Sequence, residues 1–232
     1  MIQTMILAAG RGERMRPLTD TLPKPLLPVN GKPLIVHHLE RLASVGISDV
    51  VINHAWLGER LEEELGDGSQ FDVAIQYSRE NPALETAGGI AHALPLLGDQ
   101  PFLVINGDVW CDWNPMQAVS VVNRLHDSPS QAWLLMVDNP PQHPDGDFHL
   151  DSLGYLHPRQ ADAPALTYAG IGVFHPSLFR SIDPEQPAPL APLLRMAMGT
   201  RSVEGYHYTG QWTDVGTPER LADLDRQLRV AS

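Results

Sequence analysis

The sequence predicts a single α/β domain in which helices flank a mixed, mostly parallel β-sheet. The chain has 232 residues, 43% of them hydrophobic, which is enough for one fairly large core. Apolar runs typical of buried strands alternate with segments of helical period, an order typical of crossover connections between parallel strands. No repeat, low-complexity tract or linker divides the chain, so we expect residues 1–232 to form one domain.

The first half of the chain shows this alternation most clearly. Short apolar runs that end at glycine or polar residues predict strands at 4–7, 49–53, 73–77, 101–106 and 133–137. Segments of helical period predict helices at 34–43, 57–65, 90–97 and 116–125. Between Pro23 and Pro28 we expect an extended loop, because the prolines there break regular structure.

The second half is less regular. Strands are expected at 148–150, 166–174 and 203–208, and helices at 191–198 and 218–228. Residues 140–144 are expected to be loop.

Two polar motifs directly follow predicted strands. A glycine turn comes after Leu7, and Asn106-Gly107-Asp108 follows the strand that contains Ile105. The carboxyl ends of parallel strands meet at one edge of a sheet, where ligands bind. We therefore expect these two motifs to lie close together.

Composition excludes several classes of protein. A net charge of −12 argues against a sequence-independent nucleic-acid binder, which needs a basic face. No apolar run approaches the roughly 18–20 residues that span a bilayer, and no basic segment at the start indicates a secretory signal. Cys111 is the only cysteine, so we expect a small buried residue there and no multi-cysteine zinc site. We expect a cytoplasmic protein without nucleic-acid or membrane partners.

The cations are concentrated in one place. Both lysines and three arginines lie in one early stretch: Arg11, Arg14, Arg16, Lys24 and Lys32. In an acidic protein, such a cluster is suited to receive an anion. A solvated basic loop is the alternative that charge alone leaves open.

This stretch contains a motif suited to phosphate. It reads Leu-Ala-Ala-Gly-Arg-Gly-Glu-Arg over residues 7–14 and Pro-Lys-Pro over residues 23–25. Glycines after a strand let backbone N–H groups approach phosphate oxygens, while arginine and lysine supply positive charge. The motif lacks the Gly-Lys-Ser/Thr ending of a P-loop and the third glycine of a dinucleotide fingerprint.

The two parts together resemble the signature of the sugar-1-phosphate nucleotidylyltransferases, which pairs a Leu-Ala-x-Gly-x-Gly-x-Arg turn with a downstream Pro-Lys-Pro. The resemblance extends from Met5 to about Leu221. It implies a Rossmann-like fold of the nucleotide-diphospho-sugar transferase type. It also implies an enzyme that joins a nucleoside triphosphate (NTP) to a sugar 1-phosphate and releases pyrophosphate.

The resemblance implies which residues hold the nucleotide. The first turn and the segment Leu-Glu-Thr-Ala-Gly-Gly at 84–89 would hold the base, with Glu85 and Gly88 at its edge. Taken alone, Thr86 would be a helix N-cap, and the first turn after it would expose free N–H groups. The expected nucleotide-binding residues are Leu7, Ala8, Ala9, Gly10, Gly12, Glu13, Glu85, Gly88 and Asn106.

Catalysis is expected to need charge neutralisation rather than a strong general base, because a phosphate is already a competent nucleophile. We assign this role to Arg14 and Lys24. The resemblance implies that Asp108 and Asp214 hold Mg²⁺, which usually takes one or two carboxylates plus substrate phosphates. Taken alone, Asp108 would be a turn residue, and the segment 212–218 would be a strand, a turn and a helix start.

The segment 167–172 reads as a strand with glycine bulges. The resemblance implies that Thr167, Tyr168, Gly170 and also Gly146 contact the sugar. One feature departs from the family, which often carries Glu-Lys-Pro before this strand, with the lysine on the sugar phosphate. Here the sequence is Leu-His-Pro-Arg over 156–159, and Arg159 is a candidate substitute. This departure leaves specificity for a hexose 1-phosphate open. The resemblance as a whole implies that residues 1–137 bind mainly the nucleotide and residues 138–232 mainly the sugar.

Four segments narrow the resemblance to the uridylyltransferases that act on N-acetylmuramate 1-phosphate in bacterial cell-wall recycling: 51–58, 84–89, 106–110 and 190–195. The expected substrates are then UTP and N-acetylmuramate 1-phosphate. A mannose-1-phosphate guanylyltransferase and a glucose-1-phosphate uridylyl- or thymidylyltransferase are the alternatives. The oligomeric state, monomer or homo-oligomer, stays open.

Two hypotheses from other classes explain less of the sequence. A dinucleotide-dependent oxidoreductase would use the glycine turn but leave Pro-Lys-Pro and the segment around Asp214 without a role. A non-catalytic sugar-nucleotide sensor would be expected to have lost Arg14, Lys24, Asp108 or Asp214, and the chain keeps all four.

Overall fold

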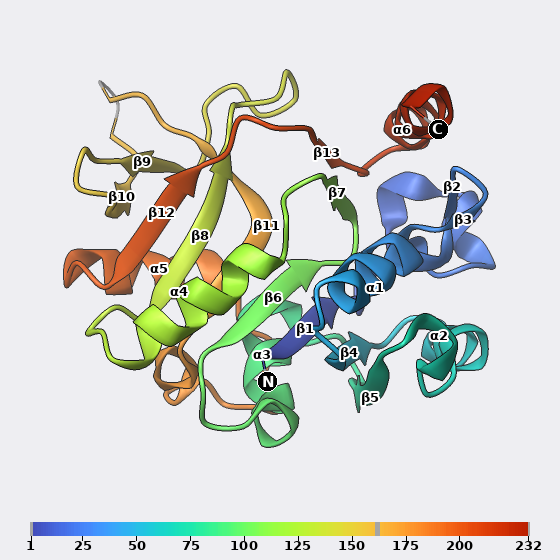
Figure 1. The fold of residues 1–232 in the computed structure, drawn as a ribbon, viewed down its shortest axis with the longest axis horizontal. Helices are drawn as coiled ribbons and strands as arrows, with labels where there is room; N and C mark the ends of the chain where they lie inside the picture. Colours follow the sequence, from blue (N-terminus) through green and yellow to red (C-terminus); the bar gives the residue numbers. More distant parts are fainter. Residues whose placement is uncertain (1, 161–162, 232) are drawn as a thin grey trace.

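The computed structural model describes residues 2–160 and 163–231 and is built on a seven-stranded sheet (Figure 1). The strand order is β12-β8-β11-β6-β1-β4-β5. β1 pairs in parallel with β4 and β6, whereas β11 runs antiparallel to β6 and β8. The strands are β1 (Gln3–Leu7), β4 (Asp49–His54), β5 (Ala74–Arg79), β6 (Phe102–Asn106), β8 (Ala132–Val137), β11 (Thr167–Phe174) and β12 (Val203–His207). The prediction of a mixed, mostly parallel sheet is confirmed.

Helices cover both faces of this sheet. Their bounds are α1 (Leu34–Ser44), α2 (Gly58–Leu65), α3 (Glu85–Leu97), α4 (Met116–His126), α5 (Leu190–Gly199) and α6 (Pro218–Ala231). α1, α2 and α4 share one apolar core, and α3 and α5 share another on the opposite face. In Figure 1, α4 lies in front of the sheet and α3 behind it.

The period of the strands explains the two cores. Successive side chains of a strand point to opposite faces, so a run in which every residue is apolar fills both. Ile6 packs into the core of α1 and α4, and its neighbour Met5 packs into the core of α3 and α5. Both side chains are 0% exposed, which identifies β1 as a central strand.

Smaller pairs of strands extend the carboxyl edge of the sheet. They are β2 (Pro28–Val29) with β3 (Lys32–Pro33), β7 (Val109–Cys111) with β13 (Trp212–Asp214), and β9 (Phe148–Leu150) with β10 (Leu156–Pro158). Short 3₁₀ turns lie at Glu13–Met15, Leu18–Asp20, Lys24–Leu26, Ser69–Phe71 and Pro176–Phe179. The antiparallel pair of β7 and β13 brings the end of the chain back to the end of β6.

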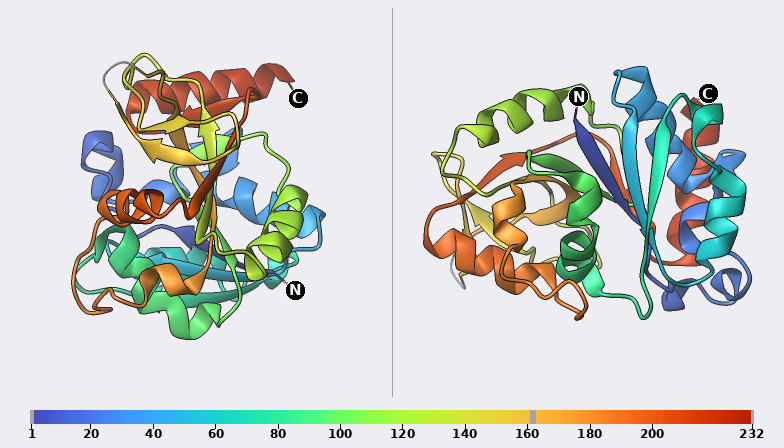
Figure 2. Two further views of the ribbon diagram at one scale, coloured as in Figure 1. Left: turned by 90° about the vertical axis from the view of Figure 1, so that its left-hand side faces the viewer. Right: turned by 90° about the horizontal axis from the view of Figure 1, so that it is seen from below.

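α6 packs away from both faces of the sheet. Its residues Leu221 and Leu224 form a third apolar cluster with Met15, Leu34 and Val215. Figure 2 shows this helix, in red, lying across the end of the molecule where the N-terminal loop also lies. The C-terminal helix therefore braces the loop that follows β1. Across the described residues, every helix is too short or too polar to cross a membrane.

Most predicted elements are present, with two differences. α3 begins at Glu85 rather than at residue 90, and its N-cap is Leu84 without a side-chain cap, so the interpretation of Thr86 as N-cap is wrong. The interval 23–28 contains a 3₁₀ turn, Lys24–Leu26, rather than extended loop alone. Both differences place polar side chains at the carboxyl edge of the sheet.

Candidate active site

The two motifs that follow β1 and β6 meet as predicted. Leu7 lies opposite Asn106 in the parallel register of the two strands, and Gly107 N donates to Leu7 O at 2.8 Å. A Cβ atom at Gly107 would lie only 2.7 Å from that same oxygen, so only glycine permits this approach. The glycine turn and Asp108 thus leave the sheet side by side.

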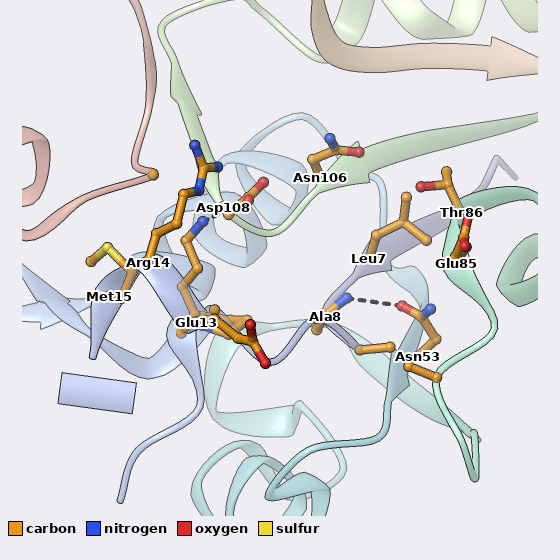
Figure 3. A pocket seen from close by; sticks show the side chains of 17 residues that line it. Leu7, Ala8, Glu13, Arg14, Met15, Asn53, Glu85, Thr86, Asn106 and Asp108 are labelled. Atoms are coloured by element: carbon orange, nitrogen blue, oxygen red, sulfur yellow. Dashed lines mark hydrogen bonds and ion pairs between the residues drawn. The ribbon is translucent and has the colours of Figure 1, made fainter. Parts of the chain in front are cut away.

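A cavity of about 490 Å³ opens between these motifs. Figure 3 shows Arg14 and Asp108 at one end of it, Glu85 and Thr86 at the other, and Ala8 between them. The predicted site residues that line it are Leu7, Ala8, Ala9, Gly10, Gly12, Glu13, Arg14, Lys24, Glu85, Asn106 and Asp108. Residues that sequence reasoning did not assign also line it: Met15, Pro25, Asn53, Ala83, Thr86 and Gly216.

The loop after β1 folds back on itself at Gly12. This residue has φ +66°, and its carbonyl accepts a hydrogen bond from Thr19 Oγ1 at 2.8 Å. A Cβ atom at Gly12 would lie 3.1 Å from Thr19 Cγ2 and 3.2 Å from Lys24 Cβ. The close packing at Gly12 therefore holds Lys24 against the glycine turn.

The two predicted catalytic cations differ in their surroundings. The Lys24 side chain is only 8% exposed, and its Nζ lies 2.6 Å from Asp108 Oδ2. Arg14 lies in the same cavity but, within the described part of the chain, forms no ion pair. One cation is thus buried on an aspartate, and the other remains available for an anion.

Asp108 lies in the turn just before β7, and Asp214 ends β13, the strand that pairs with β7. Asp214 is the register partner of Val109, and Val215 N donates to Asp108 O at 2.9 Å. His38, which is buried in α1, supports this corner, because its Nε2 lies 2.8 Å from Val109 O. Burial lowers the pKa of His38 to about 4, so the imidazole that donates to this carbonyl is neutral at pH 7.

The two carboxylates nevertheless face different cavities. Asp108 lines the 490 Å³ cavity, whereas Asp214 lines an adjacent cavity of about 200 Å³. Arg220 Nη1 lies 2.5 Å from Asp214 Oδ2. Each predicted metal ligand therefore carries its own basic partner, Lys24 on one and Arg220 on the other.

The carboxylates of Asp108 and Asp214 fit a divalent ion such as Mg²⁺ that is also bound by phosphate oxygens. No group of three or more His, Cys, Asp or Glu side chains in the described residues could hold a metal by itself. Asp108 and Asp214 supply hard oxygen donors, and Mg²⁺ normally completes such a pair with phosphate oxygens and water. A divalent ion is therefore expected to bind here together with a nucleotide rather than alone.

Gly88 does not line the 490 Å³ cavity. Its N–H and that of Ala87 both donate to Ala188 O, at 3.1 and 2.9 Å. A Cβ atom at Gly88 would lie 2.6 Å from Gln186 O, so the glycine lets α3 pack against the segment 186–188. The expectation that this helix start leaves its N–H groups free is wrong. The residues of α3 that reach the cavity are Glu85 and Thr86.

A second large cavity, of about 420 Å³, lies over β11 and the start of α5. It shares Glu85 and Thr86 with the first cavity, so the two adjoin. Tyr168, which is predicted to contact the sugar, lines this cavity, and burial raises the pKa of its phenol. Asp147 also lines it and accepts a hydrogen bond from Tyr168 N at 2.8 Å.

The other three predicted sugar residues shape the wall of this cavity rather than line it. Thr167 is buried and donates to Asn139 Oδ1 at 2.9 Å. Gly146 has φ +64°, and a Cβ atom there would lie 2.6 Å from the same amide oxygen. Gly170 has φ +75° and packs against Asn106, so β11 approaches the end of β6 closely.

Arg159 lies away from both large cavities. Its side chain is 48% exposed and pairs with Asp145 at 3.3 Å. Sequence reasoning missed Asn53, Asp147 and Arg220. Asn53 had a usable signal, because it is a polar residue near the end of a buried strand, as Asn106 is.

Comparison with known proteins agrees with this geometry. Residues 3–230 match the nucleotidyl transferase family. The chain is 53% identical, over 96% of both chains, to the N-acetylmuramate alpha-1-phosphate uridylyltransferase of Neisseria meningitidis. It is 35% identical to the enzyme of that name from Caulobacter vibrioides, over 98% of this chain and 96% of the other.

The fold has a solved counterpart. A putative glucose-1-phosphate thymidylyltransferase from Bacillus anthracis superposes with a TM-score of 0.85, at 21% identity, covering 99% of this chain and 96% of that one. Members of the family generally use a divalent metal ion. Because the family match spans nearly the whole sequence and most of the predicted nucleotide-binding residues line one cavity, the chain belongs to the nucleotidyl transferase family and is a sugar-1-phosphate nucleotidylyltransferase.

Proposed function

We propose that the protein transfers a uridylyl group from UTP to N-acetylmuramate 1-phosphate, giving UDP-N-acetylmuramate and pyrophosphate. The observation that carries this proposal is the pair of adjoining cavities, one lined by Arg14 and Lys24 and one beside Tyr168, that share Glu85 and Thr86. The choice of substrates rests on the 53% identity to the Neisseria enzyme. We place the reaction in the cytoplasm, in the recycling of peptidoglycan sugars.

In this proposal the chain is one domain with two functional halves. Residues 1–137 contribute the larger cavity, in which the nucleotide triphosphate would lie against the turn after β1. Residues 138–232 contribute most of the smaller one, in which the sugar would lie beside Tyr168 and Asp147. The two cavities adjoin at Glu85 and Thr86, so the bound sugar and the bound nucleotide would lie next to each other.

The reaction is an in-line displacement at the α-phosphorus of UTP. An oxygen of the sugar phosphate forms the new P–O bond while the bond to pyrophosphate breaks. Bringing two anions together is the main barrier, so positioning and charge neutralisation would supply most of the rate. Arg14 and Lys24 would neutralise the phosphates from the loop side.

Asp108 and Asp214 would hold Mg²⁺ together with the phosphates. The ion would supply additional positive charge to the phosphate oxygens. When the carboxylates take the ion, Lys24 and Arg220 would lose their present partners and become available to the substrate anions. Arg220 thereby joins Arg14 and Lys24 as a candidate phosphate-binding residue.

The test is a panel of UTP, GTP, dTTP and ATP against N-acetylmuramate, mannose, glucose and N-acetylglucosamine 1-phosphates. Turnover is read as pyrophosphate release, and the product is identified by mass spectrometry. We expect UTP with N-acetylmuramate 1-phosphate to give the highest kcat/KM, at least about tenfold above every other pair, a margin of about 1.4 kcal/mol. Preference for GTP with mannose 1-phosphate would overturn the proposal in favour of a guanylyltransferase.

A further inference from the structure

Two segments that line the nucleotide cavity are tied to one buried carboxylate. Ala8 N donates to Asn53 Oδ1 at 2.9 Å, as Figure 3 shows, and Asn53 Nδ2 donates to Glu80 Oε1 at 2.7 Å. The other oxygen of Glu80 accepts a hydrogen bond from Leu84 N at 2.7 Å. Glu80 thus links the turn after β1 to the start of α3, on the opposite wall of the cavity.

This link is enclosed by protein. Asn53 is 2% exposed and Glu80 is 6% exposed. A Cβ atom at Gly89 would lie 2.5 Å from Glu80 Oε1 and 2.9 Å from Asn53 Nδ2, so α3 presses directly on the pair. Gly89 is therefore required for the link, which accounts for the second glycine of the Leu-Glu-Thr-Ala-Gly-Gly segment.

Glu80 also fixes the orientation of the Asn53 amide. Both hydrogen bonds made by the Glu80 carboxylate are accepted bonds, so Asn53 must turn its NH₂ group toward Glu80. Its carbonyl oxygen is then left to face Ala8 N. A buried donor without a partner costs about 1–3 kcal/mol, which makes the reversed amide unfavourable.

The Glu80 carboxylate also anchors a strained turn at the start of α3. Glu85 follows Leu84 and has φ +58°, a left-handed conformation that costs a residue with a side chain roughly 1–2 kcal/mol. Leu84 N is anchored to Glu80, and Leu84 O accepts a hydrogen bond from Ala188 N at 3.0 Å. These bonds on both sides of Leu84 hold the turn that carries Glu85 and Thr86 into the cavity.

We infer that Asn53 and Glu80 are positioning residues for the nucleotide. They set the distance between the turn at Ala8 and the wall at Glu85, and hence the affinity for the base, without contacting the reacting atoms. The inference rests on the proposed function, in that a nucleotide must occupy the 490 Å³ cavity. It concerns the nucleotide only, so the sugar phosphate should be bound normally when the link is broken.

The inference is tested by exchanging the amide and the carboxylate between the two positions. In Asn53→Asp, a carboxylate faces the Glu80 carboxylate across the present 2.7 Å contact. In Glu80→Gln, the NH₂ group of the new amide must face either Asn53 Nδ2 or Leu84 N, so one hydrogen-bond donor lies opposite another. In the double variant, the new glutamine amide donates to the new aspartate carboxylate and accepts from Leu84 N, and the same carboxylate accepts from Ala8 N. The double variant therefore restores every bond and keeps one buried carboxylate.

We expect each single variant to raise the KM for UTP about tenfold, the effect of losing one to two buried hydrogen bonds. The KM for the sugar phosphate should stay within about twofold. The double variant should return the KM for UTP to within about threefold of the wild type. The KM is informative because it does not depend on how much of the enzyme is folded.

Glu62→Gln is the matched control. Glu62 accepts bonds from His54 and Arg79 on the same two strands, outside the cavity. Its loss should lower the Tm without changing either KM. If a single variant does not fold, Asn53→Ala takes its place, since it breaks the link without opposing like groups, and it should raise the KM for UTP similarly.

Two results would overturn the inference. One is a rise in both KM values by the same factor in the single variants. The other is a double variant that folds but binds UTP as weakly as the single variants. Failure of the proposed function is distinguishable, because the wild type itself would then show no saturable binding of UTP by calorimetry.

Discussion

The two large cavities are built in different ways. The nucleotide cavity is made by strand ends and by residues held from behind by buried groups, such as Asn53 and Glu80, which are 2% and 6% exposed. The sugar cavity is lined mainly by residues of β9, β11, α3 and α5, and its polar residue Asp147 has a side chain that is 36% exposed. Buried hydrogen bonds resist rearrangement more strongly than exposed ones, because their loss leaves polar groups without water.

This difference indicates a division of labour. The rigid side would hold the nucleotide and the reacting phosphates in a fixed geometry, as displacement at phosphorus requires. On the sugar side, an exposed side chain such as Asp147 can change without disturbing the core, which suits a surface that distinguishes one sugar from another. Variants on the two sides should therefore fail differently, the first in turnover and the second in affinity for the sugar.

Loss of Lys24 should have the largest effect. Lys24→Met removes a cation that is 8% exposed and is held on Asp108, so turnover should fall about 10³-fold, the range for removing one buried electrostatic contact to a transition state. Pyrophosphate release measures this, and circular dichroism checks the fold. Lys32→Met is the control, because Lys32 pairs with Glu40 in an exposed ion pair and its loss should leave turnover unchanged. Near-normal turnover of Lys24→Met would contradict the role of Lys24 in charge neutralisation.

His38 should make the rigid side sensitive to acid. Burial lowers the pKa of His38 from 6.5 to about 4. Below pH 6.5 the unfolded chain therefore binds a proton that the folded protein excludes, and stability falls until pH 4 is reached. Between pH 6.5 and pH 5 this amounts to about 2 kcal/mol of unfolding free energy.

Urea unfolding of His38→Gln at these two pH values tests the effect. Glutamine can still donate to Val109 O but carries no charge, so the variant should lose about 2 kcal/mol less stability than the wild type over this interval. Subtracting the two curves removes the contribution of the carboxylates that both proteins share. Equal losses would mean that His38 is protonated in the folded state.

Replacing Asn139 should have a smaller and selective effect, limited to the sugar cavity. Its Nδ2 donates to Ala165 O at 2.9 Å and to Pro144 O at 3.1 Å, and its Oδ1 accepts from Thr167 Oγ1 at 2.9 Å. Asn139→Leu would release the loop beside Gly146. The KM for the sugar phosphate should rise about fivefold, equivalent to about 1 kcal/mol, while the KM for UTP stays constant. A rise in the KM for UTP as well would mean that the two cavities are not independent.

The sequence was most informative where local pattern decides structure. β1, β4 and β6 were predicted from uniformly apolar runs, and the meeting of Leu7 with Asn106 followed from the rule for parallel strands. Residues that end such strands and carry polar groups were therefore correctly placed at the cavity. Asn53 obeys the same rule and was missed, although its position at the end of β4 was predictable.

Contacts between segments that are distant in the sequence could not be predicted. Gly88 was assigned to the nucleotide, but the structure packs it against Gln186 and Ala188, which no local pattern links to it. Arg159 was considered as a substitute for the family lysine, but Asp145 holds it on the surface. Arg220 lies beside Asp214 because α6 starts at the turn after β13; the sequence predicts this turn, but the ion pair depends on how the two side chains are oriented in the folded chain.

The most direct test of the account is whether Asp108 and Asp214 bind one divalent ion together, since they now face adjacent cavities. Electron paramagnetic resonance of Mn²⁺ with UTP measures this for the wild type, Asp108→Asn, Asp214→Asn and a control, Asp223→Asn, which lines the smaller cavity beside Asp214. We predict that both of the first two variants weaken Mn²⁺ binding at least about tenfold and that the control does not. Wild-type binding by Asp214→Asn would contradict the shared site.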